Sequence, residues 1–478
     1  MCPNPGDLDI FALSRGWRLR VDHGRGLVYK FTQDEARWLR LGIPETVALI
    51  LCDGHRRFAE VVSLCAQMLG LARDQALKAT ISLVDGVGVG ESIMMRLREP
   101  QDGFVCCDMA QALKAIATGE SDPLSTSRLE YPLSLLLVPT YVCHTDCIYC
   151  YAERPRTPPG RLMSPGRWVE LLREAGDRGL DLVTFSGGDP LAYREIDRLL
   201  AVVEAYGMDC VLPTKSFVSA ARAQQLAGFF TGGGYVQISV DSLDPEVAAA
   251  MTMRQGYAEC ARASIRNLLA AGVPVRTNTV VTPLNLGTVE RLLRELRRMG
   301  VSRAYVTNYG RSYYRHRDEL FLSPSQTQWL TSMVEDLKAE SDWSALFCNA
   351  TVVDYGQPEG GRDESWGRRS SCSGGFSSCA ILPDGDVILC EQVPHDERFV
   401  VGNLKETSLS EVWSSPVLTR FIVPDREAFT GTPCAECGDF DPCHRVFGRC
   451  FRDAYFSYGR IFAPSPMCPR AEPGIRMS

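Results

Sequence analysis

Three cysteines in one short stretch constrain this chain more than any other feature. Residues 133–151 read LSLLLVPTYVCHTDCIYCY, so Cys143, Cys147 and Cys150 follow an apolar, strand-like run in a C-x3-C-x2-C arrangement. Three thiolates on one loop can bind three irons of a 4Fe–4S cubane and leave the fourth iron open to another ligand. A zinc site would normally take a fourth protein ligand, and the local candidate, His144, has the wrong spacing for a zinc finger.

The composition indicates the compartment and the classes of partner to expect for this chain. The chain has 478 residues and an odd number of cysteines, 19, and it begins with MCPNPGDLDI, which lacks the pattern of a secretory signal. We therefore expect a reduced, cytoplasmic protein without a disulfide framework. A formal charge of -7 argues against nucleic acid or a membrane surface as a partner. No run of about 18 apolar residues predicts a membrane span.

The hydrophobic pattern predicts three domains. Residues 1–120 begin with a β-hairpin and continue with three amphipathic helices, which predicts a winged-helix-like domain, followed by a polar linker over residues 121–131. Residues 121–320 alternate strand-like runs with amphipathic helices, which predicts an α/β fold with a parallel sheet. Residues 321–478 are rich in Gly, Pro and Cys and lack long periodic elements, so we expect a Cys-rich domain that its cysteines stabilise.

Six strand-like runs in the middle domain set its architecture. Six βα units predict a partial (β/α)6 barrel rather than a closed eight-stranded one, with ligands at the carboxyl ends of the strands. The predicted strands cover residues 133–138, 182–185, 209–212, 235–240, 273–281 and 303–307.

The neighbours of the three cysteines complete a resemblance to a known family. Tyr149 precedes the third cysteine, and the second predicted strand ends in the sequence SGGDP at residues 186–190. This pattern resembles the radical S-adenosylmethionine (SAM) superfamily, in which C-x3-C-x-aromatic-C follows the first barrel strand and a Gly-Gly-Glu-Pro-like turn follows the second. The resemblance implies that Cys143, Cys147 and Cys150 hold a 4Fe–4S cluster whose open iron binds the amino and carboxylate groups of SAM.

The same resemblance implies further contacts to SAM. Tyr149 would lie near the adenine, and the turn of Gly187, Gly188, Asp189 and Pro190 would let the backbone approach the methionyl amino group. Asp189 stands where the family commonly has Glu.

Later strand ends extend these implied contacts. Ser239 and Asp241 would reach the SAM carboxylate or ribose, Arg254 would be a supporting cation, and Asn278 would stand at the fifth strand end. Taken singly, each is equally consistent with a polar residue that caps a loop. At the third strand end we expect Lys215 to be a solvated loop residue, with a charge at the pocket floor as the alternative.

The C-terminal cysteines resemble the SPASM extension, which carries two auxiliary iron–sulfur clusters. The interval between Cys443 and Cys450 has six residues where three are typical. Zinc is an alternative here, since C-x2-C is also a zinc spacing. The resemblance assigns one cluster to Cys372, Cys390 and Cys450, with Cys379 as a candidate fourth ligand, and the other to Cys434, Cys437, Cys443 and Cys468.

The front domain suggests what the substrate is. Residues 42–62, GIPETVALILCDGHRRFAEVV, resemble the recognition element of systems that mature ribosomally made peptides. In such systems the leader of a precursor peptide adds as a strand to a β edge. The alternative is a structural cap on the barrel. Residues 311–317, RSYYRHR, would contact an acidic peptide or form a solvated loop.

Together the resemblances imply a peptide maturase that uses a 5′-deoxyadenosyl radical to form an intrapeptide cross-link, with SAM and three 4Fe–4S clusters as cofactors. We favour a Cys thioether, as made by thioether-forming maturases including that for a quinohemoprotein amine dehydrogenase subunit. Alternatives are a carbon–carbon cross-link, sulfatase-maturase-like oxidation of a Cys or Ser, and a non-catalytic peptide-binding scaffold. Expected partners are a precursor peptide with a leader and an electron donor such as flavodoxin or ferredoxin.

Overall fold

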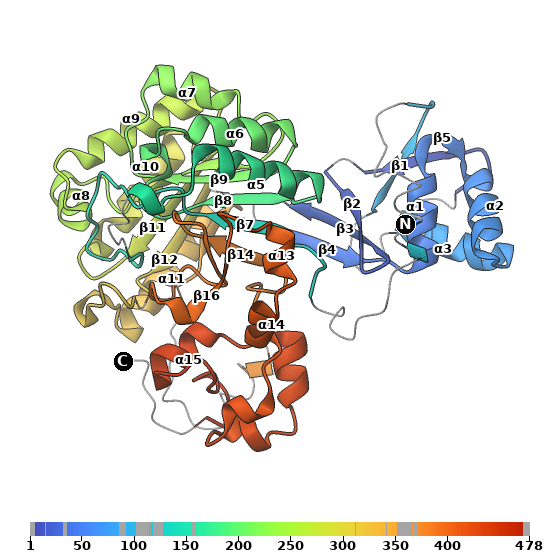
Figure 1. Cartoon of the computed structure of the whole chain (residues 1–478). Helices are drawn as coiled ribbons and strands as arrows, with labels where there is room; N and C mark the ends of the chain where they lie inside the picture. Colours follow the sequence, from blue (N-terminus) through green and yellow to red (C-terminus); the bar gives the residue numbers. More distant parts are fainter. Residues whose placement is uncertain are drawn as a thin grey trace. The chain divides into compact units, whose positions relative to one another are not determined.

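The chain forms two compact units, Met1–Tyr131 and Pro132–Ser478, and each is described by itself (Figure 1). The structure is a computed structural model. It describes residues 5–14, 16–31, 36–85, 92–101, 114, 116–117, 128–153, 159–310, 312–340, 342–350, 366–367 and 371–471. The first seven residues of the predicted linker, 121–127, and Arg311 therefore lie outside the described residues. No helix in these ranges is long and apolar enough to cross a bilayer.

In its described residues, the first unit contains two three-stranded antiparallel sheets, in the orders β2-β3-β4 and β5-β1-β6, and the helices α1, α2 and α3. The predicted hairpin and the three predicted helices are present. The other strands are short, and β5, with the sequence DGHRR, has no apolar residue to indicate it. The elements are β1 (Ile10–Leu13), β2 (Arg18–Asp22), β3 (Arg25–Phe31), β4 (Ala36–Arg40), α1 (Ile43–Leu51), β5 (Asp53–Arg57), α2 (Phe58–Leu69), α3 (Arg73–Asp85) and β6 (Met94–Leu97).

A buried carboxylate ties the β2–β3–β4 sheet to the end of this unit. Asp22 is 1% exposed, and its carboxylate lies 2.7 Å from Nη2 of Arg40 and 3.6 Å from Nη2 of Arg20. It also accepts a hydrogen bond from the backbone N–H of Glu130 at 2.8 Å. The two arginines donate in turn to the carbonyls of Tyr131 and Arg128, so that residues 128–131 are held against the sheet.

Replacing Asp22 by Ala is expected to destabilise the first unit by about 3–5 kcal/mol, because it leaves two buried arginines without their carboxylate. Urea unfolding of the full chain, followed by circular dichroism, measures the change. The matched control is Asp74→Ala in the exposed first turn of α3, which should cost less than about 1 kcal/mol. Equal losses in the two variants would contradict this account of Asp22.

A ten-stranded sheet forms the centre of the second unit, in the order β13-β12-β11-β10-β9-β8-β7-β14-β15-β16. The strands from β7 to β12 match the six predicted ones, and neighbouring strands among them are parallel. The predicted α/β class and partial barrel are therefore confirmed. The six strands are β7 (Ser134–Leu137), β8 (Leu182–Phe185), β9 (Asp209–Thr214), β10 (Tyr235–Ser239), β11 (Val275–Val281) and β12 (Arg303–Asn308).

The sheet continues beyond the predicted barrel on both sides. The strand β13 (Leu346–Cys348) pairs in parallel with β12, and β14 (Ser378–Ile381) pairs in parallel with β7. The antiparallel strands β15 (Asp386–Ile388) and β16 (Val400–Asn403) follow β14. Figure 1 shows β14 beside β7. The start of the Cys-rich segment is therefore part of the central sheet.

Amphipathic helices cover the strands on the outside of the barrel (Figure 1). Side chains of Ser164, Ser219 and Asp244 cap three of them by accepting a backbone N–H in the first turn. The helices are α5 (Pro165–Asp177), α6 (Ile196–Ala205), α7 (Ala220–Ala227), α8 (Pro245–Thr252), α9 (Tyr257–Ala270), α10 (Val289–Arg298) and α11 (Pro324–Glu340), with α13 (Leu409–Trp413), α14 (Pro416–Ile422) and α15 (Phe451–Tyr458) in the C-terminal part.

Successive residues of β11 alternate between the buried core and the cavity inside the barrel. Val275, Thr277, Thr279 and Val281 are buried, whereas the alternate residues Arg276, Asn278 and Val280 line a cavity. A period of two is the expected consequence of the β-pleat. The side chains of Arg276 and Asn278 therefore face the cavity.

Candidate functional site

A cavity of about 480 Å³ lies at the carboxyl ends of the barrel strands. Most of the residues that the sequence analysis assigned to SAM and its cluster line this cavity. They come from the loops after β7 and β8 and from strands β10 and β11, where Ser239 ends β10 and Asn278 lies within β11 rather than at its end. The folded barrel brings these four segments together. The predicted residues that line it are Cys143, Cys147, Tyr149, Cys150, Gly187, Gly188, Asp189, Pro190, Ser239 and Asn278.

The glycine turn after β8 packs directly on the cysteine loop, which we define as residues 139–151. The backbone N–H of Gly188 donates to the carbonyl of Thr140 at 3.0 Å, and the N–H of Asp189 donates to that of Val142 at 2.7 Å. A Cβ atom on Gly188 would stand 2.2 Å from the Val142 carbonyl oxygen. Gly187, with φ of 106°, has a conformation that side chains disfavour. Both glycines are thus required by contact with the cysteine loop.

Two of the three thiols of the cysteine loop share a hydroxyl partner. Oγ1 of Thr145 lies 3.4 Å from Sγ of Cys143 and 3.5 Å from Sγ of Cys147. Among the described residues, no three His, Cys, Asp or Glu side chains converge as the ligands of one metal ion would. A cubane binds each thiolate to a different iron, so its ligands need not converge on one point. Three thiols lining one cavity fit a cluster of this kind.

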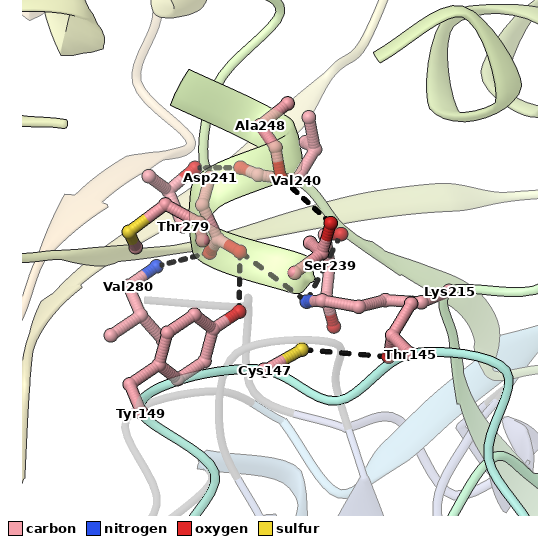
Figure 2. A network of polar contacts seen from close by, with 12 residues as sticks. Thr145, Cys147, Tyr149, Lys215, Ser239, Val240, Asp241, Ala248, Thr279 and Val280 are labelled. Atoms are coloured by element: carbon pink, nitrogen blue, oxygen red, sulfur yellow. Dashed lines mark hydrogen bonds and ion pairs between the residues drawn. The ribbon is translucent and has the colours of Figure 1, made fainter. Parts of the chain in front are cut away.

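Asp241 is the centre of a polar network behind the cysteine loop (Figure 2). Its carboxylate is 1% exposed, accepts a hydrogen bond from the hydroxyl of Tyr149, and accepts the N–H of Val280 at 3.0 Å. Burial, together with the charge of Asp241, raises the pKa of Tyr149 well above its ordinary value. Tyr149 therefore stays protonated and is held in place by Asp241.

The expectation that Lys215 is a solvated loop residue was wrong. Its side chain is 11% exposed, and Nζ lies 3.5 Å from the carboxylate of Asp241 and 3.3 Å from the carbonyl of Ser239. Burial acts to lower the pKa of Lys215, but Asp241 and the thiols of Cys147 and Cys143 raise it overall. The lysine is thus a cation near the cysteine loop. Its place in a loop did not indicate this, because its partner Asp241 follows a different strand.

Asp189 organises the turn that carries it. Its buried carboxylate accepts hydrogen bonds from the hydroxyl of Thr214 and from the backbone N–H groups of Leu191, Lys215 and Ser216, at 2.8–3.0 Å. The shorter Asp side chain therefore joins the loops after β8 and β9. Arg254 lines a neighbouring cavity with His144 and Ser216, and its buried Nη1 has no hydrogen-bond partner in the part of the chain that the structure describes.

Glu391 is a cavity residue that the sequence analysis missed. It is half-buried, its carboxylate accepts the hydroxyl of Ser186 at 2.6 Å, and burial raises its pKa, while hydrogen bonds from Ser186 and Tyr151 lower it. Glu391 follows the predicted cluster ligand Cys390, and the pairing of β14 with β7 brings it to the barrel. A position next to a motif cysteine was the one available signal.

Ser312 and Arg315 of the predicted peptide-contacting segment contact the cysteine loop, whereas Tyr313 and Tyr314 between them are exposed. Arg315 forms an ion pair with Asp146 at 2.6 Å and donates to the carbonyls of Asp146 and Cys147. The hydroxyl of Ser312 lies 3.4 Å from the carbonyls of Cys150 and Tyr151. The segment therefore helps to fix the loop geometry.

Several C-terminal cysteines act on one another electrostatically. Burial raises the pKa of Cys434 to about 11, and Cys468, Cys443 and Cys437 contribute to the rise. The pKa of Cys390 also rises to about 11, through burial and with a contribution from Cys372. In contrast, burial accounts for the rise of the Cys379 pKa to about 12. These all-thiol donors fit anionic iron–sulfur clusters, as does Arg449, a buried cation without a hydrogen-bond acceptor among the described residues.

Comparison with known proteins settles the class of this site. Residues 137–301 match the model of the radical SAM superfamily, and residues 372–452 match that of the iron–sulfur cluster-binding SPASM domain. The chain is a radical SAM enzyme. The two domains imply SAM and iron–sulfur clusters as its cofactors.

Curated relatives align with this radical SAM enzyme over most of their length. The PqqA peptide cyclase of Granulibacter bethesdensis is 25% identical over 350 residues, which cover 72% of this chain and 88% of that protein. The PqqA peptide cyclase of Gluconobacter oxydans is also 25% identical, over 342 residues that cover 70% of this chain and 90% of that protein.

Solved structures share the fold to different extents. Streptococcus suis SuiB bound to S-adenosylmethionine matches with a TM-score of 0.69 and 18% identity, covering 96% of this chain and 99% of that one. Native anSMEcpe with bound AdoMet matches with a TM-score of 0.50 and 16% identity, covering 70% of this chain and 94% of that one.

Replacing Gly188 by Ala should lower SAM cleavage at least about 100-fold, because the added methyl group displaces the cysteine loop. Formation of 5′-deoxyadenosine by the anaerobically reconstituted enzyme measures the effect. Gly232→Ala is the control, since a Cβ there meets no atom within 4 Å. Full activity in G188A would show that the loop and the turn can separate freely.

Proposed function

We propose that this radical SAM enzyme is a peptide maturase that forms a cross-link within a precursor peptide. The observation that carries the proposal is the likeness of the fold to SuiB over 96% of the chain, since SuiB has also been solved bound to its precursor peptide SuiA. The fold of anSMEcpe covers only 70% of the chain. The PqqA peptide cyclases support the same substrate class.

The proposed chemistry needs two hydrogens to leave the peptide. A 4Fe–4S cluster with SAM bound would supply one electron to the sulfonium, giving methionine and a 5′-deoxyadenosyl radical that takes one hydrogen atom from the substrate. Closing the new bond then releases the second hydrogen as a proton and an electron. We assign that electron to the auxiliary clusters, with ligation of the substrate thiolate or a purely structural role as the alternatives.

The chain's own residues hold the reaction in place in this proposal. Cys143, Cys147 and Cys150 bind the SAM cluster, with Thr145 as hydrogen-bond partner of two of the sulfurs. Tyr149 is fixed by Asp241 beside the cavity. Lys215 places a positive charge beside the site, suited to an anionic group such as the carboxylate of SAM. Ser239 and Asn278 line the same cavity and complete the proposed contacts.

The bond itself is the finer part of the proposal. We favour a Cys thioether and keep a carbon–carbon cross-link as the second candidate, since the curated relatives are peptide cyclases. Sulfatase-maturase-like oxidation of a single residue is disfavoured, because the match to anSMEcpe covers 70% of this chain whereas the match to SuiB covers 96%.

Anaerobic reconstitution tests the proposal as a whole. With dithionite or reduced flavodoxin as electron donor, SAM should yield 5′-deoxyadenosine, and Cys147→Ala should abolish that cleavage. The peptide encoded beside the gene should lose two hydrogens by mass spectrometry and give a ring that resists fragmentation. An acyclic aldehyde would instead identify the sulfatase-maturase-like reaction, and no cleavage of SAM would leave only the non-catalytic scaffold.

Iron content tests the assignment of three clusters. One auxiliary site is assigned to Cys372, Cys390 and Cys450, with Cys379 as a candidate fourth ligand. Cys434, Cys437, Cys443 and Cys468 are assigned to the other. Roughly twelve irons per chain are expected for three cubanes. Roughly four irons together with zinc would contradict the auxiliary assignment.

We assign recognition of the peptide's leader to the first unit. In the sheet β2-β3-β4, β4 is the last strand, and Trp38 on it is 38% exposed. A leader that adds to β4 would gain backbone hydrogen bonds and a contact with this indole.

Replacing Trp38 by Ala should weaken peptide binding at least about tenfold, as expected when an aromatic anchor is removed. Fluorescence anisotropy of the labelled peptide measures the affinity, and uncoupled SAM cleavage should be unchanged. Trp329→Ala, at a 47% exposed tryptophan on α11, is the control. If Trp38→Ala and Trp329→Ala bound the peptide with equal affinity, the leader would not bind at β4.

A further inference from the structure

Arg449 is a buried cation whose guanidinium nitrogens find no acceptor among the described residues. It is 6% exposed, and within that part of the chain Nε, Nη1 and Nη2 all lack a hydrogen-bond partner. A guanidinium has five N–H donors, and burial of an unpaired charge is strongly unfavourable. Something outside the described protein atoms must therefore compensate it.

The aromatic neighbours of Arg449 supply only part of that compensation. Its guanidinium carbon lies 5.0 Å from the ring centroid of Phe429 and 5.5 Å from that of Phe462. The face of a ring attracts a cation but accepts no ordinary N–H hydrogen bond. The two phenyl rings thus position the guanidinium without satisfying its donors.

The thiols around Arg449 come from both predicted auxiliary sites. Arg449 precedes Cys450 in the chain and lines one cavity with Cys372, both of one site, and Cys434 and Cys443 of the other site also act on its charge. An arginine guanidinium stays protonated in proteins. One cation is therefore shared by two groups of cluster ligands.

The chain path explains why Arg449 reaches this place. Gly448 has φ of 66°, and a Cβ on it would lie 3.1 Å from Cβ of Cys372. The backbone N–H of Cys372 donates to the carbonyl of Phe447 at 3.1 Å. These contacts draw the segment before Cys450 against Cys372. The unusual six-residue interval between Cys443 and Cys450 is the stretch that carries Arg449.

Other arginines near the same thiols have carboxylate partners. Arg452 pairs with Asp453 at 2.7 Å, and Arg470 pairs with Asp439 at 3.0 Å while it donates to Sγ of Cys437 at 3.1 Å. A carboxylate therefore balances the charge of each of these two arginines. Among the described residues, the guanidinium of Arg449 has no such carboxylate partner.

We propose that Arg449 is the shared cationic partner of the two auxiliary clusters, supplying them with positive charge and hydrogen-bond donors and thereby raising their reduction potentials. Cluster charge and hydrogen bonds to the sulfurs are among the factors that set such potentials. A buried cation stabilises the more negative, reduced state, so both clusters would accept the electron from the substrate more readily. The inference rests on the ligand assignment made under Proposed function.

A full-length parent with Cys143, Cys147 and Cys150 all replaced by Ala isolates the auxiliary clusters. In this background, Arg449→Gln should lower the midpoint potential of at least one cluster by about 59 mV or more, which is a tenfold change in a one-electron equilibrium. Redox titration with dithionite, followed by electron paramagnetic resonance, measures the shift. Arg449→Lys keeps the charge and should stay closer to the parent. Arg445→Gln, at an exposed arginine paired with Asp441, removes the same charge and should cause no shift.

Iron content separates the possible failures. A parent that binds no iron would refute the auxiliary-cluster assignment, whereas iron retained in R449Q with the potentials of R445Q would refute the role of Arg449 alone. Loss of iron in R449Q but not in R449K supports the proposal, because the positive charge is then needed for cluster binding. Loss in both variants, with R445Q intact, overturns it, because packing on the phenyl rings would be the requirement.

Discussion

The candidate site depends on two backbone hydrogen bonds between strand-end loops. The N–H groups of Gly188 and Asp189 donate to carbonyls of the cysteine loop, and no side chain fits between these two segments. The carboxylate of Asp189 then binds the loop after β9. One close contact thus fixes the ends of β7, β8 and β9 together, and the cysteines take their positions from it.

Buried charged side chains near the proposed cofactor sites either have a polar partner in the protein or lie where a cofactor would bind. Lys215 faces Asp241, and the negative charge of Asp241 compensates the cost of burying the ammonium group. Glu391 is held by Ser186 at the other side of the cavity. Among the described residues, Arg449 lies beside phenyl rings and thiols and has no hydrogen-bond acceptor. Unlike Lys215 and Glu391, Arg449 would therefore gain its compensating partner from a bound anionic group.

Much of the architecture could be predicted because the six barrel strands are apolar runs separated by amphipathic helices. Ten residues that line the cavity were also predicted, since the C-x3-C-x2-C and SGGDP motifs carry most of them. The pairing of β14 with β7 was not, because a four-residue strand gives no signal of a partner more than 200 residues earlier. Glu391 was missed, and the less favoured interpretation of Lys215 holds, for the same reason: their partners follow other strands, and spacing along the chain does not reveal them.

The pairing of β14 with β7 also determines how the protein can be divided. Strand β7 leads into the cysteine loop and lies between β8 and β14. A truncated protein that ends before residue 371 would leave the N–H and C=O groups on one side of β7 open to other chains, a known cause of aggregation. The SPASM segment thus protects the strand that presents the cysteine loop, and the barrel alone is a poor surrogate for the enzyme.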